Sequence, residues 1–166
     1  MAEITPLIKM YIQKLDPKIF GLNKIDVKGI YPIGAGESNS NYLIELNGKK
    51  IVFRLHLERN SLDKPEREYT VLKAIEQTGI APEPILYELN SNYFESSFII
   101  LDYVEGTALP SDFSLSNNQF KVLAQELAKL HLCNINKNIL HNKFSYVNYL
   151  KRFKEDIKYI EKKFID

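Results

Sequence analysis

Asn47 and Gly48 stand between two runs of apolar residues, and this pair constrains the possible folds more than any other feature of the sequence. Asn-Gly is the strongest short signal for a β-hairpin, because the tight turn needs residues that accept positive φ. We therefore predict one strand at 42–46 and a second at 50–57. The chain must then contain an antiparallel sheet, to which further strands can be added.

The segment 34–41, with the sequence GAGESNSN, is a second turn signal and follows a predicted strand at 27–33. It does not fit a dinucleotide-binding fingerprint, because Asn39 occupies the third glycine position and a strand follows where a helix is needed. It does not fit a Walker A loop either, since no Gly-Lys-Ser/Thr follows. Backbone N–H groups at such a hairpin tip could bind phosphate. Taken alone, however, the segment is better explained as an ordinary glycine turn.

Helical periodicity and capping residues predict four helices. The stretch 80–89 holds two prolines followed by a predicted strand, and a further strand is predicted at 98–104. The first helix starts with Thr5 as N-cap and ends near Asp16. Its predicted apolar face consists of Leu7, Ile8, Tyr11, Ile12 and Leu15. The other helices are predicted at 63–79, which Gly79 ends, at 116–131, which a Ser116–Gln119 capping box begins, and at 146–164.

This order of elements predicts an α+β fold, with five mostly antiparallel strands, one inserted helix and a helical segment behind them. The 166 residues are 45% hydrophobic and 26% charged, which is typical of a soluble globular protein. A net charge of +1 gives no indication of a nucleic-acid or membrane partner. The single cysteine, Cys133, excludes an internal disulfide framework and a multi-cysteine metal site, and it favours a reducing, cytoplasmic compartment. Neither a signal peptide nor an apolar run of membrane-spanning length is present.

Arg54 and Glu68 are the charged residues that the periodicity places most unusually. Glu68 shares a helix face with Val71, Leu72 and Ile75, where a carboxylate is costly unless it is paired. It could instead lie at the edge of that face, and the two interpretations are about even. Arg54 ends the IVF run of a strand, so its side chain either faces solvent or reaches into a cleft. A cleft-facing Arg54 paired with Glu68 could hold phosphate oxygens.

Five pieces of the sequence resemble, in the same order, the aminoglycoside phosphotransferase and choline kinase superfamily. They are GESNSNYLIEL, IVFRL, EREYTVLKAIEQTGIAPEPIL, FIILDYVEGTAL and LAQELAKLH, and they cover roughly residues 27–133. The resemblance implies a protein-kinase-like N-lobe at 1–105. It also implies a hinge and the start of an incomplete helical C-lobe at 106–166.

The same resemblance implies a site for ATP or GTP. Arg54 matches the basic residue that clamps the α- and β-phosphates, and Glu68 matches the helix residue that orients it. Gly36, Ser38 and Asn39 match the loop that covers the phosphates. Asp102, Tyr103 and Val104 match the hinge, where backbone groups meet adenine. His131 is expected to be a structural helix C-terminal residue, Cys133 an inert thiol, and His56 has no assigned partner.

The His-Gly-Asp-x-x-x-x-Asn catalytic loop of this superfamily is absent from the sequence. His141 and Asn148 have the right separation, but Lys143 stands where the catalytic Asp belongs, and a lysine cannot serve as that base or bind magnesium. We therefore expect no catalytic or metal-binding residue in this chain, and Mg²⁺ to be bound by a missing C-lobe. The expected function is the ATP-binding part of a small-molecule kinase, inactive by itself.

The acceptor cannot be chosen from the sequence, and an aminoglycoside, a choline-like compound, homoserine and a sugar all stay open. A catalytically dead module that binds a nucleotide or a protein is the alternative function. The last predicted helix carries Leu150, Phe153 and Ile157 on one face. We expect this chain to self-associate through that face.

Overall fold

The structure is a computed structural model, and it describes residues 4–35, 38–57, 64–107 and 114–133. Helix α1 (Ile4–Ile12) precedes the strands, α2 (Lys64–Ile75) lies between the third and fourth strands, and α3 (Asn117–Leu132) follows the last strand. The strands are β1 (Gly29–Ala35), β2 (Asn39–Glu45), β3 (Lys50–His56), β4 (Pro84–Glu88) and β5 (Phe98–Asp102). The predicted helix at 146–164 lies outside the described residues, as do Leu150, Phe153 and Ile157.

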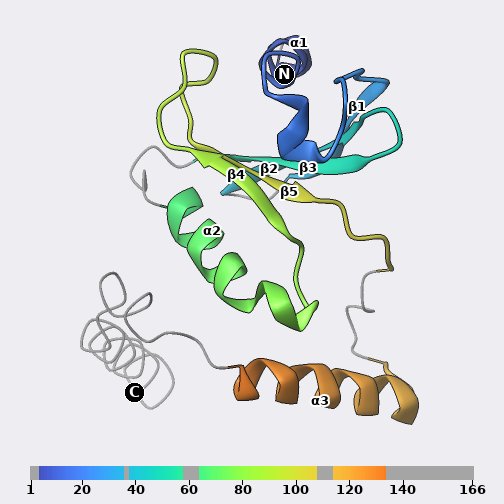
Figure 1. Cartoon of the computed structure of the whole chain (residues 1–166). Helices are drawn as coiled ribbons and strands as arrows, with labels where there is room; N and C mark the ends of the chain where they lie inside the picture. Colours follow the sequence, from blue (N-terminus) through green and yellow to red (C-terminus); the bar gives the residue numbers. More distant parts are fainter. Residues whose placement is uncertain (1–3, 36–37, 58–63, 108–113, 134–166) are drawn as a thin grey trace, which may run out of the picture. The chain divides into compact units, whose positions relative to one another are not determined.

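The strands form one five-stranded sheet in the order β1-β2-β3-β5-β4, and every neighbouring pair is antiparallel (Figure 1). This confirms the predicted α+β fold with one helix, α2, inserted between strands. The two prolines within the strands, Pro32 and Pro84, lie in the edge strands β1 and β4. Edge strands tolerate proline because its missing N–H leaves no ladder position empty.

The β2–β3 turn is the two-residue hairpin that Asn47 and Gly48 predict. Leu46 N–H donates to Lys49 C=O at 2.8 Å, and Gly48 has φ of 90°. From this turn the pairing runs without a shift to Asn39 opposite His56. The turn therefore determines which β2 residue lies beside each β3 residue.

The glycine-containing segment 34–41 was predicted as a turn, but most of its residues lie in strands β1 and β2. Gly34 and Ala35 pair with Asn41 and Ser40, so the residues at 39–41 belong to a strand and not to a turn. Strand pairing with β3 at all three residues, and with β1 at Ser40 and Asn41, satisfies backbone groups of these polar residues, and this outweighs their turn propensity. Pairing also moves β1 two residues later than predicted, to Gly29–Ala35.

Helix α1 packs on one face of the sheet and supplies part of the core (Figure 1). Tyr11 lies edge-on to Phe98 with ring centroids 5.0 Å apart, and Phe53 stacks on Phe98 at 4.5 Å. The start of this helix was predicted wrongly, because the helix already includes Ile4 and Thr5 is not its cap. Leu7 was also placed wrongly on the apolar face and is 38% exposed, since Ile8, Tyr11 and Ile12 take the buried positions.

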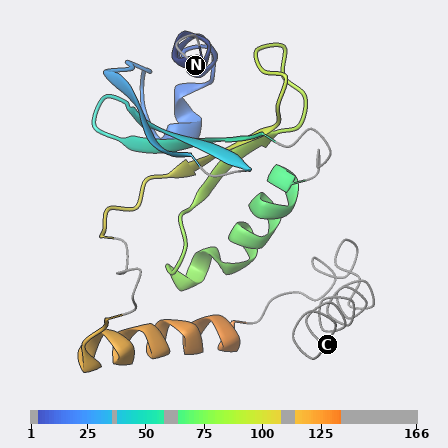
Figure 2. The same ribbon diagram turned by 180° about the vertical axis from the view of Figure 1, so that it is seen from behind.

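Helix α2 packs on the opposite face, against β4 and β5, as the two views in Figures 1 and 2 agree. A short 3₁₀ turn extends it to Gly79, whose φ of 67° provides the predicted left-handed cap. The alternation of β3 then divides its side chains between the two helices. Phe53 points to the aromatic core beneath α1, and Arg54 points to α2.

The helix α3 begins as predicted, because Ser116 and Gln119 form the capping box. Its apolar residues Phe120, Leu123 and Leu127 are 50%, 45% and 51% exposed. Within the described ranges, none of the helices combines the length and the apolar composition that a membrane span requires.

Candidate functional site

Arg54 and Glu68, which sequence periodicity left open, form an ion pair. Arg54 Nη1 donates to Glu68 Oε1, and the two side chains are 30% and 25% exposed. The arginine comes from the middle strand of the sheet, and the glutamate from the second turn of α2. The interpretation of Arg54 as a solvent-facing residue is therefore wrong. Glu68 has the partner that a carboxylate on a packed helix face needs.

Asn41 is a third member of this group, and it is not among the residues predicted from the sequence. Its Oδ1 accepts a hydrogen bond from Arg54 Nε at 2.8 Å. Asn41 lies directly opposite Arg54 in the β2–β3 ladder. The signal was present in the sequence, because a two-residue turn at Asn47–Gly48 fixes the register and so pairs Asn41 with Arg54.

His56 lies on the same side of β3 as Arg54 and is 3% exposed. Its Nε2 is 3.6 Å from Glu68 Oε2, so Glu68 lies between two residues of one strand. Hairpin register also places Asn39 opposite His56, at the start of β2. This histidine had no predicted partner, and it lies against the Glu68 carboxylate.

A cleft of about 240 Å³ opens in front of Arg54. Its walls are the sheet residues near Arg54 and the linker that follows β5. The lining residues are Ile33, Asn41, Val52, Arg54, Pro82, Leu101, Asp102, Tyr103 and Val104. Arg54 and all three predicted hinge residues therefore border one cleft, with a guanidinium at one side and backbone groups at another.

Two of the three hinge N–H groups are already used. Asp102 N–H donates to Glu83 C=O at 2.8 Å, and Tyr103 N–H donates to Lys50 C=O at 3.3 Å. Val104 is 62% exposed, and no described residue accepts a hydrogen bond from its N–H. A base in the cleft would therefore find Val104 N–H as the donor among these three.

The predicted phosphate-covering loop is described only in part. Gly36 lies outside the described residues. Ser38 C=O accepts from Leu57 N–H at 2.9 Å, and Asn39 begins β2. Asn39 and Asn41 alternate with Ser40, so both lie on the face of the sheet that carries Arg54. Among the described residues, Oδ1 of Asn39 is buried without a hydrogen bond.

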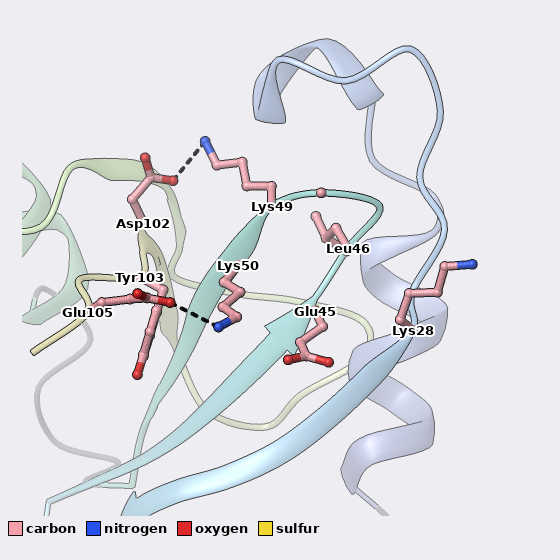
Figure 3. Close-up of a pocket in the computed structure, with 9 residues that line it drawn as sticks. Lys28, Glu45, Leu46, Lys49, Lys50, Asp102, Tyr103 and Glu105 are labelled. Atoms are coloured by element: carbon pink, nitrogen blue, oxygen red, sulfur yellow. Dashed lines mark hydrogen bonds and ion pairs between the residues drawn. The ribbon is translucent and has the colours of Figure 1, made fainter.

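A larger hollow, of about 640 Å³, lies at the β2–β3 turn (Figure 3). It is lined by charges of both signs, but the lysines on the linker side are paired. Lys49 Nζ is 2.8 Å from Asp102 Oδ1, and Lys50 Nζ is 3.0 Å from Glu105 Oε1. The Glu105 carboxylate raises the pKa of Lys50 above its ordinary value. This hollow is therefore lined by lysine–carboxylate pairs, and Arg54, Asn41 and Glu68 are not among its lining residues.

No group of three or more His, Cys, Asp or Glu side chains within the described ranges is arranged to hold a metal ion. The Arg54 cleft provides a fixed cation, one free backbone N–H among the three hinge residues, and apolar walls. Together these suit a ligand with a flat ring and an anionic tail.

The sequence model of a group described as the phosphotransferase enzyme family matches residues 29–159. Acyl-CoA dehydrogenase family member 11 from Rattus norvegicus is 26% identical, over 91% of this chain and 21% of its own length. This chain therefore spans about a fifth of that curated relative.

Two solved structures share the fold. One is a protein from Ralstonia eutropha assigned as an aminoglycoside phosphotransferase, with a TM-score of 0.64 and 17% identity over 93% of this chain and 47% of its own. The other is the GDP complex of wild-type aminoglycoside 2'-phosphotransferase-IIIa, with a TM-score of 0.62 and 18% identity over 93% of this chain and 50% of its own. Both confirm the predicted protein-kinase-like fold, and this chain spans about half of each.

Proposed function

Because this chain belongs to the phosphotransferase enzyme family, we propose that it is the nucleotide-binding part of an enzyme that transfers a phosphoryl group from ATP or GTP to a hydroxyl group of a small molecule. In this proposal residues 1–105 form the nucleotide-binding lobe, and residues 106–166 form the hinge and the start of a second, helical lobe. The enzyme acts in the cytoplasm.

The observation that carries the proposal is the Arg54–Glu68 pair at the wall of the cleft. Phosphoryl transfer depends on positioning and on neutralising the charge of the nucleotide phosphates. Arg54 would bind the α- and β-phosphates through the N–H groups that Glu68 does not use. Glu68 would hold Arg54 in place, and the loop with Gly36, Ser38 and Asn39 would cover the phosphates.

The residues that follow β5 line the part of the cleft where we propose that the nucleotide base binds. In the proposal the ring lies among Ile33, Val52 and Leu101, and one edge faces Asp102, Tyr103 and Val104. Val104 N–H would be the donor to the ring. An adenine or a guanine could accept this bond, and one of the structural neighbours holds GDP.

The catalytic base and the ligands of Mg²⁺ have no candidates in this sequence, which lacks the His-Gly-Asp-x-x-x-x-Asn loop. We assign them to a part of the enzyme outside this sequence, so the 166 residues alone bind nucleotide without transferring phosphate. Bound Mg²⁺ would supply positive charge that offsets the negative charge of the nucleotide phosphates. The acceptor is a small hydroxyl compound, such as an aminoglycoside, a choline-like compound, homoserine or a sugar.

A catalytically dead nucleotide-binding or protein-interaction module is the second candidate, and the missing catalytic loop favours it. The two differ in one outcome. The whole enzyme would consume ATP or GTP when given its hydroxyl acceptor, whereas the dead module would bind nucleotide without any turnover.

Isothermal titration calorimetry of the 166-residue chain with ATP and GTP, with and without Mg²⁺, tests the proposal. We expect one site that Arg54→Ala weakens by about tenfold or more, because a charged hydrogen-bond donor to phosphate is lost. Lys73→Ala is the matched control, since Lys73 lies on α2 and pairs with Glu76 away from the cleft. The proposal fails if the wild-type chain binds neither nucleotide, or if Arg54→Ala binds as tightly as Lys73→Ala.

A further inference from the structure

We propose that Asn41 is a positioning residue that fixes the guanidinium of Arg54, and that this arrangement requires arginine and excludes lysine at position 54. The role of Asn41 follows from contacts within the described chain. Only the identity of the anion bound by Arg54 rests on the proposed function.

Two acceptors from two different elements hold two different nitrogens of Arg54. Asn41 on β2 accepts from Nε at 2.8 Å, and Glu68 on α2 accepts from Nη1. Because the guanidinium is planar and rigid, contacts at two of its nitrogens fix both its position and its rotation. A single ion pair with Glu68 would leave the plane free to turn about that contact.

The Asn41 amide is itself held in one orientation. Its Oδ1 faces the Nε–H donor of Arg54, while its Nδ2 lies 3.5 Å from the Gly34 carbonyl oxygen on β1. Exchanging the amide oxygen and nitrogen would set donor against donor and acceptor against acceptor. Asn41 therefore links Arg54 to the strand that enters the glycine-containing loop, the other phosphate-binding part of the proposed site.

A neutral acceptor suits this position better than a carboxylate. Glu68 already balances the single positive charge of Arg54. An aspartate at position 41 would give the group a net negative charge beside the cleft that would receive phosphate. An asparagine orients the guanidinium without adding that charge.

Arginine has five N–H donors, and two of them are used by Asn41 and Glu68. No other described side chain accepts a hydrogen bond from Arg54, so the remaining donors are left to a ligand at the cleft. A lysine has three donors on one nitrogen. The same two acceptors would leave it a single donor, with no forked edge for a phosphate group.

Hydrogen exchange of the Arg54 Nε–H, followed by ¹⁵N–¹H NMR of the whole chain, tests the positioning directly. The Arg54 signal is identified by its loss in Arg54→Lys. We expect this proton to exchange at least about tenfold more slowly than in an exposed arginine, which corresponds to about 1.4 kcal/mol. Asn41→Leu should abolish this protection, and Asn41→Asp, which keeps an acceptor oxygen, should retain it. Protection that survives in Asn41→Leu would overturn the proposal.

Affinity for Mg²⁺-ADP provides a second readout that a merely structural role would not reproduce. Asn41→Leu should weaken binding by about tenfold in the wild-type chain and have little further effect in Arg54→Lys, because its action passes through the guanidinium. Asn90→Leu is the control for the substitution itself, since Asn90 is exposed and lies after the end of β4, outside the sheet. Equal weakening by Asn41→Leu in both backgrounds would overturn the proposal.

The two readouts separate this inference from the proposed function. If the wild-type chain binds no nucleotide, the proposed function fails, and the exchange rate of Arg54 Nε–H still decides whether Asn41 positions the guanidinium. Circular dichroism spectra of all variants establish that a lost signal reflects the site and not unfolding.

Discussion

Coupling between Arg54 and Glu68 is the quantity on which the site depends most, and a double-mutant cycle measures it. The cycle compares the wild-type chain with Arg54→Ala, Glu68→Ala and the double variant. Each single substitution leaves one other contact of the pair in place. Asn41 still contacts Arg54 in Glu68→Ala, and His56 still faces Glu68 in Arg54→Ala. Only the cycle isolates the term that belongs to the pair.

The burial of the pair sets the expected magnitude. Fully exposed ion pairs contribute about 0.2–1 kcal/mol, while breaking a buried pair costs about 3–5 kcal/mol. With side chains 30% and 25% exposed, this pair lies between those limits. We expect a coupling free energy of about 1–2 kcal/mol. A destabilisation equal to this coupling corresponds to a fall in Tm of roughly 2–8 °C, because a chain of this length loses about 2–4 °C per kcal/mol.

Urea denaturation of the four proteins gives the free energies of unfolding from which the coupling is obtained. The matched control is the same cycle on Lys129 and Glu126, whose side chains are 56% and 39% exposed. That pair should couple by about 0.3–0.5 kcal/mol and lose most of it at high salt. A coupling free energy between Arg54 and Glu68 no larger than that of the control pair would refute the view that this ion pair is partly desolvated and holds Arg54 in place.

Three other predictions concern separate parts of the chain. Gly48→Ala should destabilise the fold by about 1–2 kcal/mol in urea denaturation, because Gly48 has φ of 90°, and Gly106→Ala, at a residue without positive φ, should cost less. Burial and the neighbouring Glu88 carboxylate raise the pKa of Tyr11 above its ordinary 10.0, so Tyr11 ionises at a lower pH in the unfolded chain, and the free energy of unfolding should fall as pH rises above 10.0. Tyr11→Phe should make that fall smaller, and a variant with the same pH profile as the wild type would contradict the assignment. Self-association through Leu150, Phe153 and Ile157 predicts a concentration-dependent mass in sedimentation that Leu150→Asp removes, and a wild-type chain that stays monomeric at high concentration would contradict it.

Local signals in the sequence predicted most of the fold because each was tied to one backbone requirement. Asn47–Gly48 gave the hairpin, Gly79 gave the end of α2, and Ser116 gave the start of α3. The predictions failed where tertiary pairing decided the outcome. The polar residues at 39–41 have turn propensity, but Ser40 and Asn41 are paired on both sides in the sheet and Asn39 is paired with β3.

Periodicity within a single helix or strand could not predict the contacts between elements that make up the candidate site. Periodicity left open whether Glu68 lies on the packed face of its helix or at the edge of that face. The contact between Glu68 and Arg54 depends on how α2 lies on the sheet. Asn41 and His56 were accessible to reasoning, because the hairpin register assigns their cross-strand neighbours. The hydrogen bonds of the Asp102 and Tyr103 N–H groups could not be predicted from the sequence, since their acceptors belong to segments distant in sequence.

Helix α1 has a practical consequence for where this protein can be cut. The family match begins at residue 29, yet Ile8 and Ile12 are fully buried and Tyr11 contacts Phe53 and Phe98. A version trimmed to the matched region would expose the aromatic face of the sheet to water and to other copies of itself. The domain boundary is thus set by packing and lies some two dozen residues before the boundary that family similarity indicates. Expression designs for this protein should keep the N-terminal segment.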